Sequence, residues 1–316
     1  MFVQNPPDIT PCPAQLGHAP AHTWNRRQLL GTAVRLARGS YVLSTEWDSL
    51  PVWARSRMVV EAWHRVDPGA VVGGATSLAL QGLPVLLEPG ALHLVQSAPT
   101  ARHSRHRVVQ GGRTIASYRV LRHLRPWPAP TVIEVGHWRV EEACEAAVFV
   151  ASRPGTSLGE AVVAIDGAWR RAGGGQGVRD RLLDLGQAFP GAASRDRVRA
   201  ALEQASPLAE SAAESLARLA IRSLGFSAPV EQLTLYLEGH EVRPDFTWPE
   251  AKLVLEVDGA VKYSGGDEAG VRRQEKARQA VLVRAGYRVV RAEWADVTRP
   301  DRLRSILATL GVPPAR

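Results

Sequence analysis

The strongest constraint on the fold lies in the last hundred residues, where the apolar pattern changes period several times. A helix is predicted from Ser206-Pro207 to about Leu224, because serine and proline favour the first positions of a helix and Gly225 follows. The remaining elements are predicted as strands over 230–237, 242–248, 253–257 and 287–292 and helices over 268–285 and 300–310. This α-β-β-β-α-β-α order predicts a compact mixed α/β domain over 206–316 rather than a regular parallel doubly wound one.

Carboxylates gather on two of these strands. Asp245 lies on the second strand, and Glu256 and Asp258 lie two residues apart on the third, so alternation sends both side chains to one face. If the strands pair, three carboxylates converge, and their repulsion raises a pKa unless a divalent cation lies among them. Oxygen ligands without a nearby thiolate favour Mg²⁺ or Mn²⁺ over zinc. The sequence therefore predicts a metal site at these three residues, with an acidic cluster on a structural sheet as the alternative.

The same stretch carries a resemblance to a known family. Pro244-Asp245 followed by Glu256 and Asp258 resembles the PD-(D/E)XK nuclease superfamily. More closely, the chain is similar to a bacterial endonuclease-like domain of unknown function related to the Vsr mismatch endonucleases, over the runs 254–259, 261–263, 275–276 and 286–291. The resemblance covers about residues 206–312. It implies a restriction-endonuclease-like αβββαβ core and metal-dependent hydrolysis of nucleic-acid phosphodiester bonds.

The resemblance also assigns roles to further residues. In that group a helix glutamate precedes the core strands, and Glu214 is similar to it, so Glu214 is expected to orient a metal-bound water or to help a second ion. The superfamily also has a lysine two residues after the strand glutamate, where this chain has Asp258. Only three lysines occur in the chain, at 252, 262 and 276. Lys262, or else Lys276, is expected to bring an ammonium group to that space. Catalysis is predicted at Glu214, Asp245, Glu256, Asp258, Lys262 and Lys276.

Before residue 206 the pattern is less regular. A helix over 24–37, a strand over 40–43, helices over 52–66 and 75–81, strands over 92–95, 114–121 and 131–135, and helices over 141–152 and 157–171 are predicted. Arg35, Gly39 to Val42 and the run 76–84 are similar to the N-terminal region of AbiEi-type antitoxins, in which a winged helix binds operator DNA. Residues 1–50 are therefore expected to hold an arm and a partial winged-helix segment, and 51–205 a mixed α+β region.

Arginine dominates the charge of the chain. Lys and Arg number 39 against 31 Asp and Glu, which gives a formal net charge of +8 and favours an anionic partner, most simply nucleic acid. The run 102–125 has seven arginines and no acidic residue. Within it, phosphate contacts are predicted at Arg102, Arg105, Arg107, Arg113 and Arg119, with a solvated face of an arginine-biased protein as the equal alternative.

Several protein classes lack support in the sequence. The two cysteines are far apart, no secretory signal is recognisable, and no run is apolar enough to span a membrane, so a cytoplasmic location is expected. The main interpretation is a Mg²⁺- or Mn²⁺-dependent DNA endonuclease linked to DNA repair or phage defence, with DNA favoured over RNA. The alternative is a non-catalytic DNA-binding regulator or antitoxin whose nuclease-like domain is inactive.

Overall fold

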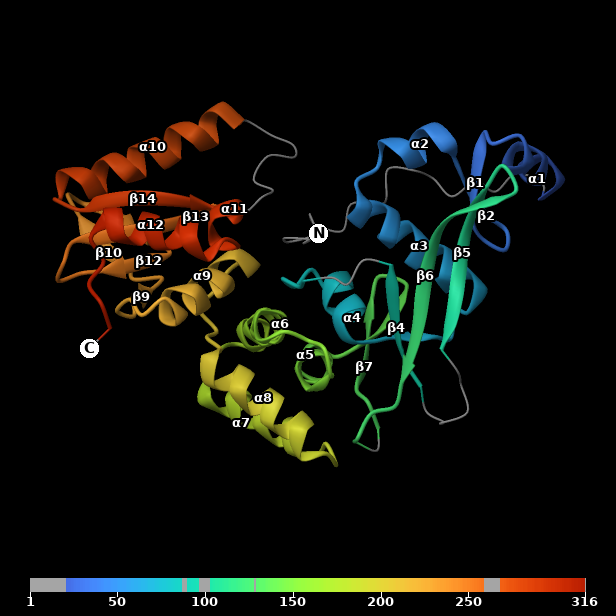
Figure 1. The fold of residues 1–316 in the computed structure, drawn as a ribbon, viewed down its shortest axis with the longest axis horizontal. Coiled ribbons are helices and arrows are strands. Elements are labelled where there is room, and N and C mark those ends of the chain that lie inside the picture. The colour runs from blue at the N-terminus through green and yellow to red at the C-terminus, as the bar shows by residue number, and fades with distance from the viewer. Residues whose placement is uncertain (1–20, 87–89, 97–102, 128, 259–267, 316) are drawn as a thin grey trace.

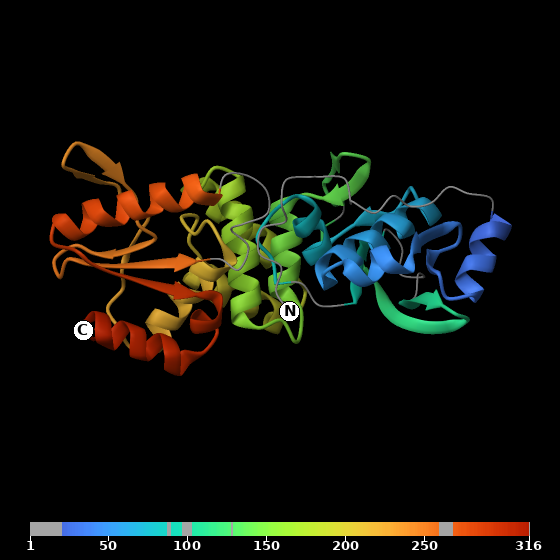
Figure 2. The same ribbon diagram turned by 90° about the horizontal axis from the view of Figure 1, so that it is seen from above.

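The computed structural model describes residues 21–86, 90–96, 103–127, 129–258 and 268–315. Three parts follow one another along the long axis of the molecule: a β-rich N-terminal part, a group of four helices and a C-terminal α/β part (Figures 1 and 2). The chain is thus a mixed α/β protein, as expected, and its helical part separates the arginine-rich strands from the acidic ones.

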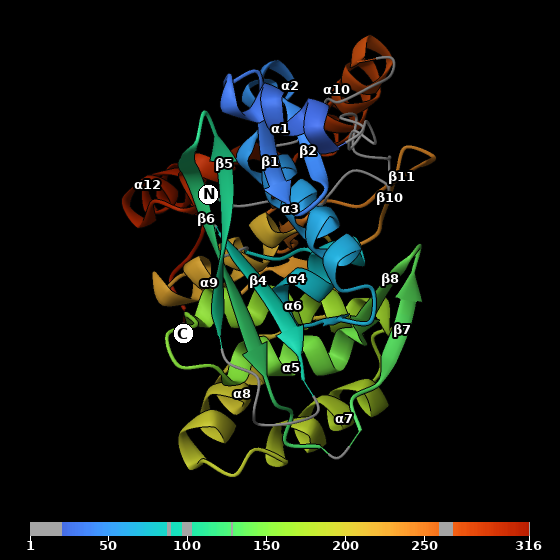
Figure 3. The same ribbon diagram turned by 90° about the vertical axis from the view of Figure 1, so that its right-hand side faces the viewer.

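The N-terminal part is built around one eight-stranded mixed sheet, in the order β2-β1-β5-β6-β4-β3-β8-β7 (Figure 3). Its strands are β1 (Ala33–Ala37), β2 (Ser40–Leu43), β3 (Val71–Val72), β4 (Ala91–Val95), β5 (Ser104–Gln110), β6 (Arg113–His123), β7 (Val132–Val135) and β8 (Trp138–Glu141). Its helices are α1 (Ala21–Leu29), α2 (Ser44–Ser49), α3 (Val52–Val66) and α4 (Gly74–Leu80). Because β1 and β2 share this sheet with β3–β8, the sheet continues across the predicted boundary at residue 50.

The predicted helix over 24–37 is wrong. The helix ends at Leu29, Gly31 adopts φ +77°, and Ala33–Ala37 forms an antiparallel hairpin with β2. Val34 and Leu36 are fully buried against α3, whereas Arg35 between them is exposed. The spacing of the apolar residues fits both a helix and a strand. The strand forms because it buries these side chains in the core on one face of the sheet.

Four helices form the middle part: α5 (Ala143–Ser152), α6 (Leu158–Arg171), α7 (Gln176–Gln187) and α8 (Ala192–Gln204). The predicted helices over 141–152 and 157–171 are confirmed by α5 and α6. Every residue of α5 is buried, and its core includes small residues such as Ala146 and Ala147, which allow the helices to pack closely. α6 begins with a capping box between Ser157 and Glu160.

The C-terminal part has a four-stranded sheet in the order β14-β13-β12-β9. Its elements are α9 (Ala212–Ser223), β9 (Val230–Glu231), β10 (Leu235–Leu237), β11 (His240–Val242), β12 (Phe246–Trp248), β13 (Leu253–Asp258), α10 (Glu268–Arg284), β14 (Arg288–Glu293), α11 (Trp294–Val297) and α12 (Pro300–Leu310). β13 pairs antiparallel with β12 and parallel with β14 across the α10 connection, while β10 and β11 form a separate hairpin. The mixed α/β character predicted for this part of the chain is confirmed.

Helices cover both faces of this sheet. Leu253, Leu255 and Val257 of β13 face one core, which they share with α9, α11 and α12. Val254 faces the opposite core with Val281 and Leu282 of α10. By strand alternation Glu256 and Asp258 belong to the α10 face, so the prediction that they avoid the face of Leu255 and Val257 agrees with the structure.

Three predictions in this part are wrong, namely the start of one helix and the continuity of two strands. α9 begins at Ala212, with Ser211 as its N-cap, and not at Ser206-Pro207. The strand predicted over 230–237 is broken into β9 and β10, because Gln232 adopts the left-handed φ of +50°. The strand predicted over 242–248 is broken into β11 and β12 around Pro244, which has no N–H to donate to a strand neighbour.

Within the described ranges of the chain, no helix combines the length and apolar character that crossing a membrane requires.

Candidate functional site

Glu214 lies in the first turn of α9. The Ser211 hydroxyl accepts from the Glu214 amide at 3.2 Å and donates to Glu214 Oε1 at 2.7 Å, while the Glu210 amide donates to Oε2 at 2.8 Å. A glutamate at this position is a common helix cap. Ala213, Ala217 and Ile221 pack on the sheet face made by β13, so the same helix turn also holds Glu214 near the ends of β12 and β13.

A second carboxylate lies beside this cap. The side-chain amide nitrogen of Gln232 donates to Glu214 Oε2 at 3.0 Å and to Asp245 Oδ1 at 3.2 Å, so one amide joins the two carboxylates. Burial, followed by the negative charge of Asp245, raises the pKa of Glu214 to about 7. The fold therefore holds two repelling carboxylates together, which is the electrostatic arrangement that a divalent cation relieves.

The backbone fixes Asp245 at the junction of two strands. Asp245 directly precedes β12, and its Oδ2 accepts from the backbone N–H of Val257 in β13 at 2.8 Å. Its own carbonyl oxygen accepts from the Gln232 amide N–H at 3.0 Å. Asp245 is thus tied to both of the segments that approach it, and the Gln232 side chain joins it to Glu214.

Glu256 and Asp258 have a different environment, on the α10 face of β13. Arg278 of α10 donates to Glu256 Oε1 at 3.1 Å, and Arg291 of β14 donates to Asp258 Oδ2 at 3.3 Å. Glu256 is buried and Asp258 half-buried. Over the part of the chain that the structure describes, no group of three or more His, Cys, Asp or Glu side chains is arranged to hold a metal ion. A metal shared by Asp245, Glu256 and Asp258 stays a prediction.

The three lysines occupy separate places. Lys262 lies outside the described residues. Lys276 lies on α10 with an exposed side chain. Lys252 adopts φ +52° and its ammonium donates to the carbonyl of Ala285 at 2.9 Å, so it joins the start of β13 to the end of α10. The expected delivery of an ammonium by Lys262 or Lys276 stays a prediction.

Three of the predicted phosphate-binding arginines share one exposed face of the β5–β6 hairpin. Arg105 lies directly opposite Arg119, and Arg107 follows two residues along β5, so the three side chains leave the sheet on the same side. Arg113 pairs with Gln110 at the hairpin end, on the other side of the pleat. Arg102 lies outside the described residues. The face is basic, as the sequence indicated; phosphate binding stays a prediction.

The two ends of this face carry additional arginines that were not predicted as site residues. Arg35 of β1 lies opposite Val109, which places its exposed side chain on the same side as Arg107. Beyond α5, Arg153 has its pKa lowered by burial and then by the charge of Arg119. Positive charge therefore extends from β1 across β5 and β6 to the end of α5, and it favours an anionic partner.

Sequence reasoning also missed Gln232, Arg278 and Arg291. Gln232 was predicted inside a continuous strand. The signal that was present is the pair of adjacent polar residues Glu231 and Gln232, which interrupts the strand pattern. The two arginines carry no local signal at all. They reach Glu256 and Asp258 only because α10 and β14 pack beside β13.

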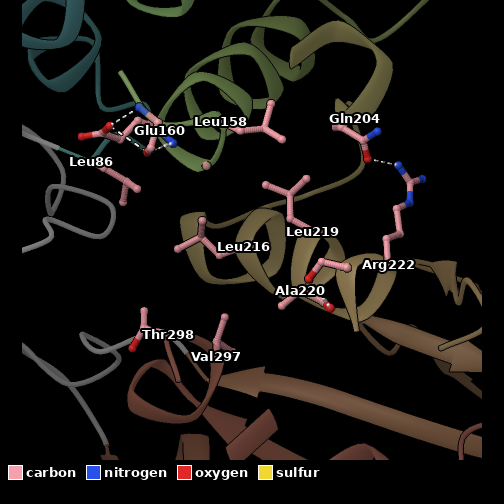
Figure 4. Close-up of a pocket in the computed structure, with 13 residues that line it drawn as sticks. Leu86, Leu158, Glu160, Gln204, Leu216, Leu219, Ala220, Arg222, Val297 and Thr298 are labelled. Carbon is pink, nitrogen blue, oxygen red and sulfur yellow. Dashed lines mark hydrogen bonds between the residues drawn. The ribbon is translucent and has the colours of Figure 1, made fainter. Parts of the chain in front are cut away.

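A cavity of ≈ 760 Å³ lies between α6, α9 and α11 (Figure 4). Its lining is largely apolar and includes Leu158, Leu216 and Leu219, and the polar pair Gln204 and Arg222 closes one side through a 3.1 Å hydrogen bond. It contains none of the predicted site residues and uses a face of α9 other than the one that bears Glu214. We therefore place the candidate site at the carboxylates and not in this cavity.

The chain is similar to two uncharacterized proteins of Mycobacterium tuberculosis, MT2308 of strain CDC 1551 / Oshkosh and Rv2248 of strain ATCC 25618 / H37Rv. Each is 35% identical over 102 residues, which cover 32% of this chain and 36% of the relative. The match thus spans about a third of the relatives' length. No family model matches the chain. No solved structure matches it either.

Proposed function

We propose that residues 206–316 hydrolyse phosphodiester bonds of nucleic acid, DNA rather than RNA, with Mg²⁺ or Mn²⁺ as the metal. The observation that carries the proposal is the pair Glu214 and Asp245, two carboxylates joined by the amide of Gln232. The arrangement of α9, three strands, α10 and β14 is consistent with the endonuclease-like core that the resemblance implies. A carboxylate pair at the ends of two strands is the kind of site on which such chemistry is built.

The donor chemistry at this pair fits a hard divalent cation. Glu214 and Asp245 offer oxygen ligands, and a cation beside them would lower the pKa of Glu214, which burial and then the charge of Asp245 raise. Glu256 and Asp258 would act as further or water-mediated ligands once Arg278 and Arg291 turn toward a bound phosphate. When bound, the metal supplies an activated water and neutralises charge on the phosphate.

The chain's own groups have roles that follow from their contacts. Gln232 orients both carboxylates by donating to each of them. Glu214 would orient a water bound to the metal that Asp245 holds, or help to hold a second ion. Lys262, or Lys276 on α10, would stabilise the charge that develops on the phosphate. The arginine face of β5–β6 would bind the nucleic-acid backbone at a place remote from the carboxylates.

The test compares the purified full chain with Asp245→Asn and Glu214→Gln, isosteric variants that remove charge with little change in volume. Plasmid, single-stranded DNA and RNA are incubated with Mg²⁺ or Mn²⁺. We expect cleavage by the wild type and a loss of at least 10²-fold in Asp245→Asn, in the range typical of groups that stabilise the transition state. Glu238→Gln is the matched control, since Glu238 is an exposed residue paired with Arg284. Equal cleavage by all four proteins would show that the activity belongs to a contaminant.

A second candidate function is favoured by the ion pairs at Glu256 and Asp258. Carboxylates that pair with Arg278 and Arg291 are also what a non-catalytic, nuclease-like domain would contain. The protein would then be a DNA-binding regulator or antitoxin that uses the basic face. Tight duplex binding by a wild type that cleaves no substrate and binds no Mn²⁺ would favour this alternative.

A further inference from the structure

A buried arginine lies one helical turn after Glu214 and connects the candidate site to the helical part of the chain. Arg218 of α9 is 1% exposed. Its guanidinium donates to Asp166 of α6, to Glu231 Oε2 at 2.9 Å and to the backbone carbonyl of Gln204 at 3.2 Å. Two of these three partners, Asp166 and Gln204, precede residue 206 and thus belong to the helical part.

The charges in this cluster depend on one another. Burial raises the pKa of Asp166, while the guanidinium of Arg218 acts in the opposite direction. The other Asp166 oxygen, Oδ1, accepts from the backbone N–H of Ser206 at 2.7 Å, so the same side chain also holds the segment that enters the C-terminal part. A buried ion pair that loses one partner leaves the other charge desolvated, so a change at Asp166 must be felt at Arg218.

From Arg218 the contacts continue to the carboxylate pair. Glu231 is the last residue of β9, pairs with Phe246 of β12 and immediately precedes Gln232. Gln232 has a φ of +50°, which a non-glycine residue keeps only where its surroundings hold it. The Arg218–Glu231 bond on one side and the Gln232–Asp245 backbone bond on the other fix this conformation and aim the amide between Glu214 and Asp245.

We propose that Asp166, Arg218 and Glu231 form a positioning relay through which α6 sets the Gln232 amide between the two carboxylates. The C-terminal part then has a complete site only while it is docked on α6. That the relay serves catalysis rests on the proposed function, whereas the positioning of the Gln232 amide by the relay does not.

The test uses the full chain with Asp166→Asn and Glu231→Gln, because Arg218→Ala would leave two carboxylates without their guanidinium and endanger folding. The first readout is the side-chain amide signal of Gln232 in ¹⁵N-glutamine-labelled protein, assigned by its loss in Gln232→Met. The second is the Kd for Mn²⁺. Glu238→Gln serves as the control, since it makes the same chemical change at an exposed pair with Arg284.

In both relay variants we expect the Gln232 signal to shift and its amide hydrogens to exchange on the order of tenfold faster. The Kd for Mn²⁺ should rise on the order of tenfold, the usual effect of removing a group that orients a metal ligand. If Asp166→Asn does not fold, Glu231→Gln still decides, because its carboxylate is 14% exposed and tolerates the change better.

An unchanged Gln232 signal in the folded variants would overturn the relay, whatever the enzyme does. A shifted signal in a chain that neither binds Mn²⁺ nor cleaves nucleic acid would support the relay and overturn the proposed function. The two failures are therefore distinguishable.

Discussion

Two buried glutamates, one in each half of the molecule, have opposite surroundings. Glu141 of β8 has a fully buried side chain that is paired with the guanidinium of Arg125, and its Oε2 also accepts from the Gly74 amide at 2.9 Å. Glu214 is 6% exposed, and the charged group that the fold brings to it is a second carboxylate, through Gln232. In the folded protein the first glutamate is paired with a positive charge, whereas the second lies beside another negative charge.

The contrast separates a structural ion pair from the carboxylate pair at which we propose a metal site. Arg125 packs 3.6 Å from the ring centre of Phe149 in α5, and its partner Glu141 accepts from Gly74 of α4, so the pair joins the sheet to both helices and serves the local core. Burial, and then the charge of Asp245, raise the pKa of Glu214, so the ionised form of Glu214 destabilises the fold at neutral pH. Carboxylates with raised pKa values are enriched at functional sites.

The largest effect is expected from breaking the structural pair. Arg125→Met removes the guanidinium and leaves the Glu141 carboxylate buried, so the free energy of unfolding should fall by about 3–5 kcal/mol. Urea denaturation at pH 7 measures it. A loss below about 1 kcal/mol would mean that backbone donors alone satisfy Glu141, which would remove the contrast between the two glutamates.

The pH dependence of stability tests the environment of Glu214. The pKa of Glu214 rises from 4.5 in the unfolded chain to about 7 in the fold. Below pH 4.5 both states are protonated; between these values the unfolded chain releases its proton while the folded chain keeps it, so stability falls as pH rises. The slope of the free energy of unfolding against pH should approach about 1.4 kcal/mol per pH unit between these values and vanish above pH 7.

Glu214→Gln removes that contribution and should flatten the decline between pH 4.5 and 7. Asp166, whose pKa burial also raises, is present in both proteins and cancels in the comparison. Denaturant titrations at half-unit pH steps give the difference. Identical slopes in the two proteins would show that folding does not raise the pKa of Glu214.

A divalent cation should reverse the repulsion. At pH 8, Mn²⁺ at 100 times its Kd should raise the free energy of unfolding by about 2.7 kcal/mol. The gain should shrink at pH 5.5, where protonated Glu214 competes with the metal, and should disappear in Asp245→Asn. Thermal melts with Mn²⁺ and with a chelator make the measurement, and Glu238→Gln should behave as the wild type does.

The smallest effect concerns the basic face. If Arg105, Arg107 and Arg119 contact phosphates, removing one of them should lower the slope of log Kd against log salt by about one for duplex DNA. Stability should hold or improve by a few tenths of a kcal/mol in Arg105→Ala, because Arg105 and Arg119 are like charges directly opposite. Arg199→Ala, on the exposed surface of α8, should leave the slope unchanged.

Much of the C-terminal part was predictable because its patterns are local. The strand over 253–257 and the helices over 268–285 and 300–310 agree with β13, α10 and α12 to within a residue or two. Near residue 30 the same reasoning failed, because the apolar spacing fits a helix and a strand equally and only burial against α3 decides between them. Pro244 and Gln232 broke strands that apolar content alone had joined.

The sequence by itself determined which chemical groups are present and on which kind of element: carboxylates at 245, 256 and 258, a helix glutamate at 214 and arginines on a hairpin. Only the tertiary structure decided which residues these groups contact. Gln232 joins Glu214 to Asp245. Arg278 pairs with Glu256, Arg291 with Asp258, and Asp166 with Arg218. The physical reason is range. Periodicity and capping act over a few residues, whereas these contacts join segments 13 to 52 residues apart, and packing of the cores alone brings them together.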